Sequence, residues 1–439
     1  MSTPVYSKYN IICRLPSGNH GIINLLSGQA DLLDRETGDS IIAGKMIRQQ
    51  EMMQKGYAVN PETESIDFKN AYLAFLDKRE QDEIQIFYAP WYSCNLRCKY
   101  CYQDEYGNSG AIPGPGTLDA FFSHIEKYFS GRRKYLTLFG GEPLLPGREH
   151  RRHILDFFER SIKNGLETAM VSNGYHIKDY IDEMKTLRLR EVQLTLDGTE
   201  KIHNQRRPCL GGGSSYYQVL EAVDLLLSKN IPVNLRFVAD QENISELPAL
   251  SELALKKGWT KSAIFKTQIG RNYELHHCSR SRQILFDRFS LYEKIFSLLQ
   301  EFPVISEFHR PAFSVTRFLA DSGELPDPLF DSCPGTKTEW AFDGNGDIYS
   351  CTASVGKKEE KLGSFYPDLI LDNDKIRNWQ KRDIMSIPGC RECNVNLACG
   401  GGCAMVAKNK TGSLHSPDCR PVKELCSLGM EYYFKTNLP

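Results

Sequence analysis

The sequence predicts an α/β fold: a partial (β/α)6 TIM-like barrel, preceded by a small N-terminal α+β domain and followed by a cysteine-rich C-terminal domain. Three observations support this prediction. β-rich runs alternate with amphipathic stretches six times between residues 84 and 267, and polar motifs directly follow the first four runs. Eight of the 14 cysteines lie between Cys333 and Cys426. We therefore expect three domains, formed by residues 1–82, 83–310 and 311–439.

The barrel prediction depends on the regular alternation in the middle of the chain. Helical segments such as 117–129 and 216–229 carry apolar residues three and four positions apart. Strands separated by helices form a parallel sheet covered by those helices. Six units are fewer than a closed eight-unit barrel needs, so we expect an open barrel. The strand segments are residues 84–88, 135–139, 167–171, 191–196, 233–238 and 263–267.

The first 82 residues predict a domain of winged-helix type. SKYNIICRL predicts a strand, DSIIAGKMIRQQEMMQKG a helix, and YAVNPET a wing-like turn. Such a domain could capture a peptide by adding a strand to an exposed sheet edge, or it could only stabilise the barrel. Beyond residue 267 the pattern predicts helices within residues 280–302 and 310–323.

Composition places the protein in a reducing compartment without a membrane or nucleic-acid partner. The 54 basic and 55 acidic residues give a net charge of -1, which offers no general attraction for nucleic acid or anionic lipid. No signal-peptide pattern and no 18-residue apolar stretch is present in the sequence, so we expect a cytoplasmic protein. Because structural disulfides are rare there, the cysteines predict metal or cluster ligation.

CNLRCKYC places Cys94, Cys98 and Cys101 directly after the first strand. Structural zinc sites and ordinary electron-transfer clusters take four protein ligands. Three cysteines leave one position open, and an iron-sulfur cluster with a free iron can bind a small molecule. A zinc site completed by a distant residue and a chance grouping are the alternatives.

With Tyr100 before its last cysteine, CNLRCKYC resembles the signature of the radical S-adenosylmethionine (SAM) superfamily. The resemblance implies a 4Fe-4S cluster on these three cysteines, with Tyr100 against the adenine of SAM. GGEP and SNG resemble two further motifs, although each alone is an ordinary turn sequence. LDGTEKIHNQRR is similar to a loop of peptide-modifying members, where Arg207 would meet the SAM carboxylate. The remaining residues implied to contact SAM are Gly140, Gly141, Glu142, Pro143, Ser172 and Asn173.

The cysteines of the C-terminal part resemble those of the SPASM domain, which carries auxiliary clusters. The resemblance implies one 4Fe-4S cluster on Cys390, Cys393, Cys399 and Cys419, so that three clusters are expected in all. Another cluster would use Cys333, Cys351 and Cys403. Either Cys426 completes this second ligand set, or one iron of that cluster has no protein ligand. For the CxxC pair of Cys390 and Cys393, a zinc ribbon is the alternative interpretation.

Some polar residues are interpreted as structural. His276 and His277, beside Cys278, are expected to pack rather than bind a metal. Asn345 and Gly346 in FDGNGDI predict a tight hairpin instead of a calcium loop. Four arginines form either solvated helix faces or a basic rim toward an acidic peptide: Arg280, Arg282, Arg288 and Arg310.

The resemblance implies an oxidoreductase that uses SAM to form a 5'-deoxyadenosyl radical, with an external reductant such as flavodoxin or ferredoxin. We expect it to install thioether or carbon-carbon crosslinks in a ribosomally made precursor peptide. Residues 1–82 of this chain would bind the leader sequence of that peptide. Anaerobic sulfatase maturation and quinoprotein maturation are the alternatives. In sulfatase maturation an aspartate follows the second auxiliary cysteine, and here Thr352 stands there. The remote alternative is a non-catalytic iron-sulfur carrier or zinc scaffold, which gives no reason for the motifs to share one rim.

Overall fold

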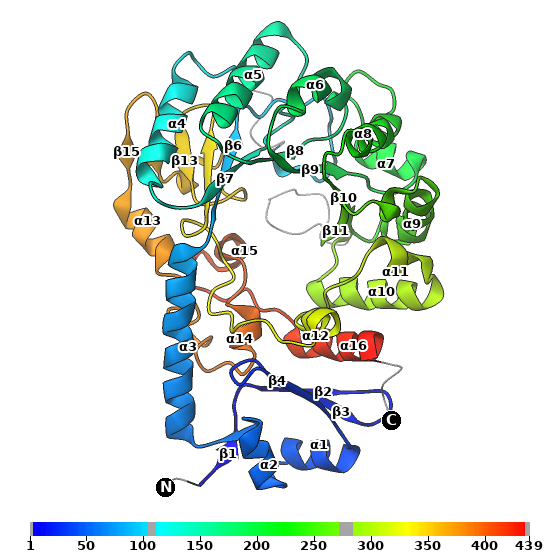
Figure 1. Cartoon of the computed structure of the whole chain (residues 1–439), viewed down its shortest axis with the longest axis vertical. Helices are drawn as coiled ribbons and strands as arrows, with labels where there is room; N and C mark the ends of the chain where they lie inside the picture. Colours follow the sequence, from blue (N-terminus) through cyan, green and yellow to red (C-terminus); the bar gives the residue numbers. More distant parts are fainter. Residues whose placement is uncertain (1–2, 104–110, 272–283, 435–439) are drawn as a thin grey trace.

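The computed structural model describes residues 3–103, 111–271 and 284–434. Figure 1 shows the barrel at one end of the molecule, the N-terminal domain at the other, and the C-terminal domain between them. The cysteine-rich C-terminal part therefore contacts both other parts of the chain.

All six predicted barrel strands are confirmed as neighbours in a parallel sheet, in chain order. They are β6 (Ile84–Ala89), β7 (Lys134–Leu138), β8 (Thr168–Val171), β9 (Leu189–Thr195), β10 (Val233–Ala239) and β11 (Phe265–Arg271). Because β11 and β6 do not pair, the barrel is open, as predicted.

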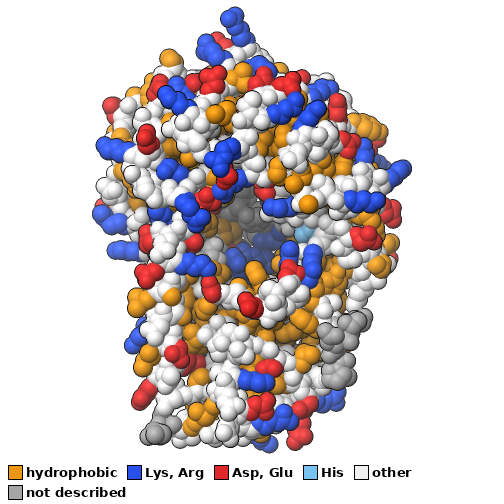
Figure 2. All heavy atoms as spheres, in the orientation of Figure 1, with side chains coloured by type: hydrophobic (Ala, Val, Ile, Leu, Met, Phe, Trp, Pro, Cys, Tyr) orange, Lys and Arg blue, Asp and Glu red, His pale blue; other side chains and the backbone are white. Residues whose placement is uncertain are grey.

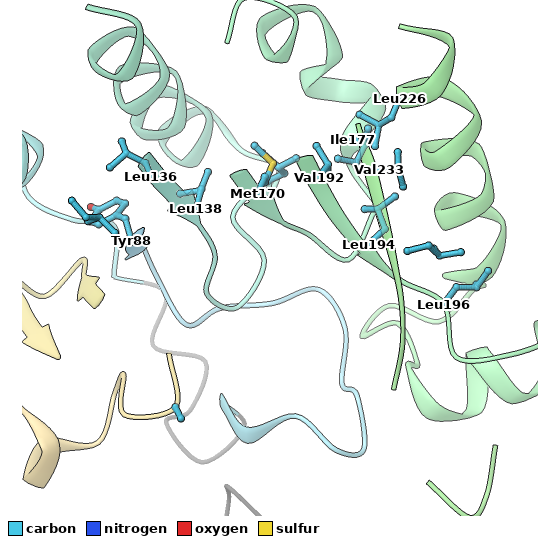
Figure 3. Close-up of a cluster of buried hydrophobic side chains, with 14 of the residues drawn as sticks. Tyr88, Leu136, Leu138, Met170, Ile177, Val192, Leu194, Leu196, Leu226 and Val233 are labelled. Atoms are coloured by element: carbon cyan, nitrogen blue, oxygen red, sulfur yellow. The ribbon is translucent and has the colours of Figure 1, made fainter. Parts of the chain in front are cut away.

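Helices cover one face of this sheet because alternate strand residues are apolar and buried. Ile84, Ile86 and Tyr88 of β6 are at most 2% exposed, and Figure 3 shows Tyr88, Leu136, Leu138 and Met170 in a row beneath the helices. The helices are α4 (Thr117–Tyr128), α5 (Arg148–Lys163), α6 (Ile177–Met184), α7 (Glu200–Arg206), α8 (Tyr216–Ser228) and α9 (Leu247–Lys256), with short 3-10 turns at Ile244–Glu246 and Trp259–Lys261. The opposite face of the sheet forms the inside of the open barrel.

The sheet continues beyond β6 into the C-terminal domain. β12 (Glu339–Asp343) pairs parallel to β6, and β13 (Asp347–Tyr349) returns antiparallel through the predicted Asn345–Gly346 hairpin. β14 (Gly363–Ser364) and β15 (Ile370–Leu371) complete ten strands. Backbone hydrogen bonds thus join the C-terminal domain directly to the strand that precedes the three-cysteine loop.

The N-terminal domain is α+β, but two of its predicted elements are wrong. The helix expected over residues 39–56 is two helices, α1 (Arg35–Ile42) and α2 (Gln49–Gln54), separated where Gly44 and Arg48 adopt positive φ. The expected wing-like turn is instead β5 (Ala58–Val59) followed by α3 (Pro61–Gln81). Asn60 caps α3 and Pro61 starts it, a combination that favours a helix.

The domain is built on an antiparallel sheet of β2 (Asn10–Arg14), β3 (His20–Asn24) and β4 (Gln29–Leu33), while β1 (Val5–Tyr6) pairs with β5. α3 runs along the C-terminal domain (Figure 1), where the Tyr72 hydroxyl donates to Asp383 at 2.6 Å. β2 packs against α16 (Val422–Phe434) at the end of the chain. A strand of the N-terminal domain and the last described helix are therefore in contact.

The remaining helices belong to the region after β11. The predicted helices are observed as α10 (Arg288–Glu301) and α12 (Thr316–Ser322), while His276, His277, Cys278, Arg280 and Arg282 lie outside the described residues. The others are α11 (Val304–Phe308), α13 (Asn373–Gln380), α14 (Asn396–Cys399), α15 (Ala404–Thr411) and a 3-10 turn at Lys358–Glu360. In the described ranges, each helix is too short or too polar to cross a membrane.

Candidate active site

The loops after β6, β7, β8 and β9 meet at one rim of the barrel. Backbone hydrogen bonds hold the cysteine loop to GGEP, from Gly141 to Trp91 at 3.1 Å and from Glu142 to Ser93 at 2.9 Å. A Cβ atom on Gly141 would lie 2.1 Å from the Ser93 carbonyl oxygen, so only glycine allows this approach. Two further bonds, from Arg97 to Pro208 and from Lys99 to Arg206, hold the loop to the motif after β9.

Glu142 links the second and third motifs. Its fully buried carboxylate accepts hydrogen bonds from the Leu144 amide at 3.0 Å, the Ser172 hydroxyl at 2.9 Å and the Asn173 amide at 2.6 Å. Burial raises the pKa of this carboxyl above its usual value. The side chain of Glu142 therefore positions the SNG loop.

Asn173 in turn touches the cysteine loop. Its side-chain amide donates to Asn95 at 2.7 Å and lies 3.7 Å from the Cys94 sulfur. The third motif is thereby placed at the edge of the three-thiol site.

Two adjacent arginines end the motif after β9, and they have different surroundings. Arg206 is 3% exposed and donates to both carboxylate oxygens of Asp240 at 2.8 Å. Arg207 donates to the Tyr100 hydroxyl at 2.7 Å, and that hydroxyl donates to Asp197 at 2.5 Å. Within the described ranges, the buried Nε of Arg207 has no hydrogen-bond partner. The Nε of Arg206 also lacks a hydrogen bond, but it lies 3.5 Å from the Asp197 carboxylate. Arg206 is thus held by two buried carboxylates, whereas Arg207 is held through the Tyr100 hydroxyl.

The three thiols of the cysteine loop lie close together. Burial, the Glu142 carboxylate and the neighbouring Cys98 and Cys101 together raise the pKa of Cys94 to about 12. Burial raises the pKa of Cys98 to about 11, while the Arg207 guanidinium acts in the opposite direction. Buried thiols of this kind stay protonated unless a metal replaces the proton. Three soft sulfur donors beside a cation suit an iron-sulfur cluster.

The C-terminal cysteines form two further groups. The pKa of Cys390 rises to about 11 through burial and the nearby Cys399, Cys419 and Cys393. Among the described residues, no three Cys, His, Asp or Glu side chains are grouped as a site for a single metal ion.

The second group brings together Cys333, Cys351 and Cys403. The pKa of Cys351 is raised by burial, by the Glu339 carboxylate and by the other two thiols, in that order. All three cysteines border the core of the barrel.

Cys426 lies elsewhere. It belongs to a hydrophobic cluster formed jointly by the N-terminal domain and the C-terminal part, and it is hydrogen-bonded to Cys13 of β2. The structure therefore pairs Cys426 with Cys13.

A cavity of about 640 Å³ separates the barrel from the C-terminal domain. Its wall includes Arg271 of β11, Arg288 of α10, and Cys403 and Arg420 from the cysteine-rich region. Arg288 is paired with Asp418, whereas Arg420 forms no ion pair with any residue in the described ranges. Figure 2 shows the hollow in this face, with basic side chains around it. Arg310, predicted for the basic rim, pairs with Asp321 at 2.6 Å.

Residues 88–254 match the family model of the radical SAM superfamily. This chain contains a radical SAM domain. The match starts in β6 and ends in α9, so it contains all four rim motifs.

Known proteins resemble this chain over more than its radical SAM domain. A serine-type anaerobic sulfatase-maturating enzyme of Bacteroides thetaiotaomicron is 24% identical over 71% of this chain and 80% of that protein. The first curated relative is matched over only 50% of its own length. The solved structure of anSMEcpe with bound AdoMet is similar with a TM-score of 0.61, at 17% identity, over 81% of this chain and 99% of that one.

A second solved structure covers more of the chain. Streptococcus suis SuiB is similar with a TM-score of 0.57, at 16% identity, over 95% of this chain and 99% of that one. The predicted resemblance to the radical SAM superfamily is confirmed by the family match, and the two solved structures confirm the predicted fold.

Sequence reasoning missed the residues that hold the predicted ones in place. Asp197 lies inside the LDG motif and could have been expected to bond nearby polar groups. Asp240 and Glu339 stand at strand ends with no motif around them. Arg382 is fully buried and donates to the carbonyls of Gly401, Gly402, Leu414 and Ser416, which fixes the loops around Cys403 and Cys419. Only the fold shows these partners.

Proposed function

We propose that this radical SAM enzyme oxidatively crosslinks a ribosomally made precursor peptide, through a thioether or carbon-carbon bond. A reduced cluster with bound SAM supplies a 5'-deoxyadenosyl radical that removes hydrogen from the substrate. The chain's own part is to bind SAM and peptide, to orient them and to exclude water from the barrel. The reaction requires a reducing compartment and an external one-electron donor of the flavodoxin or ferredoxin type, which agrees with a cytoplasmic location.

We assign the first cluster to Cys94, Cys98 and Cys101, because these thiols lie close together and Cys98 lies close to the Arg207 guanidinium. The SAM methionine group would lie along Gly140–Pro143. The ribose would lie at Ser172 and Asn173, and the adenine at the Tyr100 ring. The unused Nε donor of Arg207 suits the SAM carboxylate.

We assign two auxiliary clusters to the C-terminal thiol groups, one to Cys390, Cys393, Cys399 and Cys419 and the other to Cys333, Cys351 and Cys403. Cys399, Cys419 and Cys393 lie close enough to Cys390 to raise its pKa, and Cys333 and Cys403 do the same for Cys351. Crosslink formation removes two hydrogen atoms from the peptide, so an electron must leave the substrate after radical formation. Clusters close to the cavity provide a route for it, since Cys403 lines the cavity wall.

The observation that carries the peptide proposal is the N-terminal domain together with the cavity. β4 is the outer strand of its sheet, it has no second neighbour among the described residues, and Leu32 on it is 40% exposed. An extended leader peptide can pair with such an edge. Similarity to SuiB extends over this domain, and one SuiB structure contains its precursor peptide SuiA. The substrate core would then enter the arginine-lined cavity.

The test is anaerobic incubation of the reconstituted enzyme with SAM, reductant and the candidate precursor peptide encoded beside its gene. We expect a product that has lost two hydrogens, carries a crosslink in fragmentation spectra, and does not react with hydrazide. Deleting the leader should abolish product, while SAM cleavage without peptide should persist. If the peptide without its leader still gave as much product, the proposed binding of the leader by the N-terminal domain would be wrong.

Sulfatase maturation is the second candidate, because a sulfatase-maturating enzyme matches 71% of this chain in sequence. Formylglycine from serine also lacks two hydrogens, but its aldehyde reacts with hydrazide. Thr352 cannot act as a base at neutral pH, which disfavours this reaction. A hydrazide-reactive product from a serine peptide would establish it. Quinoprotein maturation predicts crosslinking within a folded enzyme subunit instead of a short peptide.

A further inference from the structure

Glu339 lies between two of the auxiliary cysteines. Its backbone amide donates to the carbonyl of Pro334, directly after Cys333, at 3.0 Å, and its own carbonyl accepts from Thr336 at 2.8 Å. Its carboxylate Oε1 accepts a hydrogen bond from the backbone amide of Thr352, directly after Cys351, at 3.1 Å. One residue therefore ties both cysteine segments together.

The carboxylate of Glu339 faces away from the helices. The next residue of β12, Trp340, is 2% exposed and packs against Tyr128 and Phe129 of the α4 layer. Because successive strand residues point to opposite faces, Glu339 points to the inner face of the sheet. In the described ranges, its second oxygen makes no hydrogen bond and no ion pair. That oxygen is available to a ligand.

The three cysteines of this group leave one position of a four-iron cluster without a thiolate. Cys426 is paired with Cys13 in another hydrophobic cluster. The Glu339 carboxylate lies close enough to Cys351 to raise the pKa of its thiol. Carboxylate oxygens bind iron in many proteins, and clusters accept a ligand other than cysteine.

We propose that Glu339 supplies the fourth protein ligand, a carboxylate oxygen, to the cluster held by Cys333, Cys351 and Cys403. This inference rests on the proposed ligand set of that cluster. A closed cluster cannot bind a substrate thiolate directly. Held by these four residues, it would supply electron transfer only, and the peptide would react within the cavity.

The test uses the protein in which Cys94, Cys98 and Cys101 are all changed to Ala, so that the open first cluster is removed. This background should hold about eight irons, since each cluster contains four. The reduced protein is treated with ¹³C-cyanide, and ¹³C hyperfine coupling is measured by electron-nuclear double resonance. We expect no coupling in the background, coupling in Glu339→Ala, and its loss again in Glu339→Cys, where a thiolate closes the site. Glu359→Ala, at an exposed position, serves as the matched control and should behave like the background.

Coupling in the background with Glu339 intact would show an open iron and overturn the proposal. Absence of coupling in Glu339→Ala at about eight irons would do the same, because another group would then close the site. If Cys351→Ala leaves the iron content of the background unchanged, the ligand set itself is wrong, and this failure is distinct from a failure of Glu339 alone. Should Glu339→Ala not fold, Glu339→Gln, which keeps the size of the side chain but removes its negative charge, takes its place and should show the same ¹³C coupling.

Discussion

Gly141 gives the sharpest prediction about the first cluster. Substitution by Ala would place a Cβ atom 2.1 Å from the Ser93 carbonyl oxygen, against a lower limit of 3.0 Å for real contacts. The cysteine loop must therefore move by roughly 1 Å, because the obstacle is backbone and not a flexible side chain. A misplacement of that size at a reacting centre costs roughly 100-fold in rate, and overpacking costs about 1–3 kcal/mol in stability.

The assay is formation of 5'-deoxyadenosine from SAM and dithionite, together with iron content. We expect Gly141→Ala to lower the rate roughly 100-fold while the two C-terminal clusters keep about eight irons. Gly211→Ala is the matched control, since a Cβ atom there meets nothing within 4 Å and the residue does not have positive φ. A Gly141→Ala enzyme with the wild-type rate would refute the claim that close backbone packing positions the cysteine loop.

Four further substitutions test other parts of the account. Glu142→Gln replaces an acceptor of the Asn173 amide by a donor and should weaken SAM binding by about 2 kcal/mol, or roughly 30-fold, measured by equilibrium dialysis. Arg207→Ala should weaken SAM binding about 10- to 100-fold, as loss of a charged hydrogen bond does, without changing iron content; tight SAM binding by this variant would contradict the carboxylate assignment. Arg420→Ala should raise KM for an acidic precursor about two- to fivefold at unchanged kcat, and the difference should vanish at high salt. Arg382→Met leaves buried carbonyls without donors and should lower the melting temperature and release iron from the C-terminal domain, whereas exposed Lys381→Met should not.

The barrel could be predicted well because the sequence patterns that indicate its strands and helices involve only residues close together in the chain. Alternating burial in β6 and β10 follows from apolar residues two apart, and each helix follows its strand within a short stretch. The cysteine motif, GGEP and SNG were placed at one rim for the same reason, since carboxyl ends of parallel strands share an edge.

Long-range pairing could not be predicted in this way. β12 joins β6 although about 250 residues separate them, and nothing in EWAFD specifies that partner. α3 was missed because YAVNPET was interpreted as a turn, although Asn60 and Pro61 form a helix start. The partners of Glu142 and Arg206, the pairing of Cys426 with Cys13, and the position of Glu339 all depend on the folded chain.

The central claim is that Cys94, Cys98 and Cys101 hold a cluster that cleaves SAM, beside two clusters in the C-terminal domain. The most direct measurement is iron content and 5'-deoxyadenosine formation after anaerobic reconstitution, for the wild type and for the variant with these three cysteines changed to Ala. We predict about twelve irons per wild-type chain, about eight in the variant, and loss of 5'-deoxyadenosine, since each cluster contains four irons. Bound zinc without SAM cleavage, or SAM cleavage that survives the triple substitution, would contradict the account.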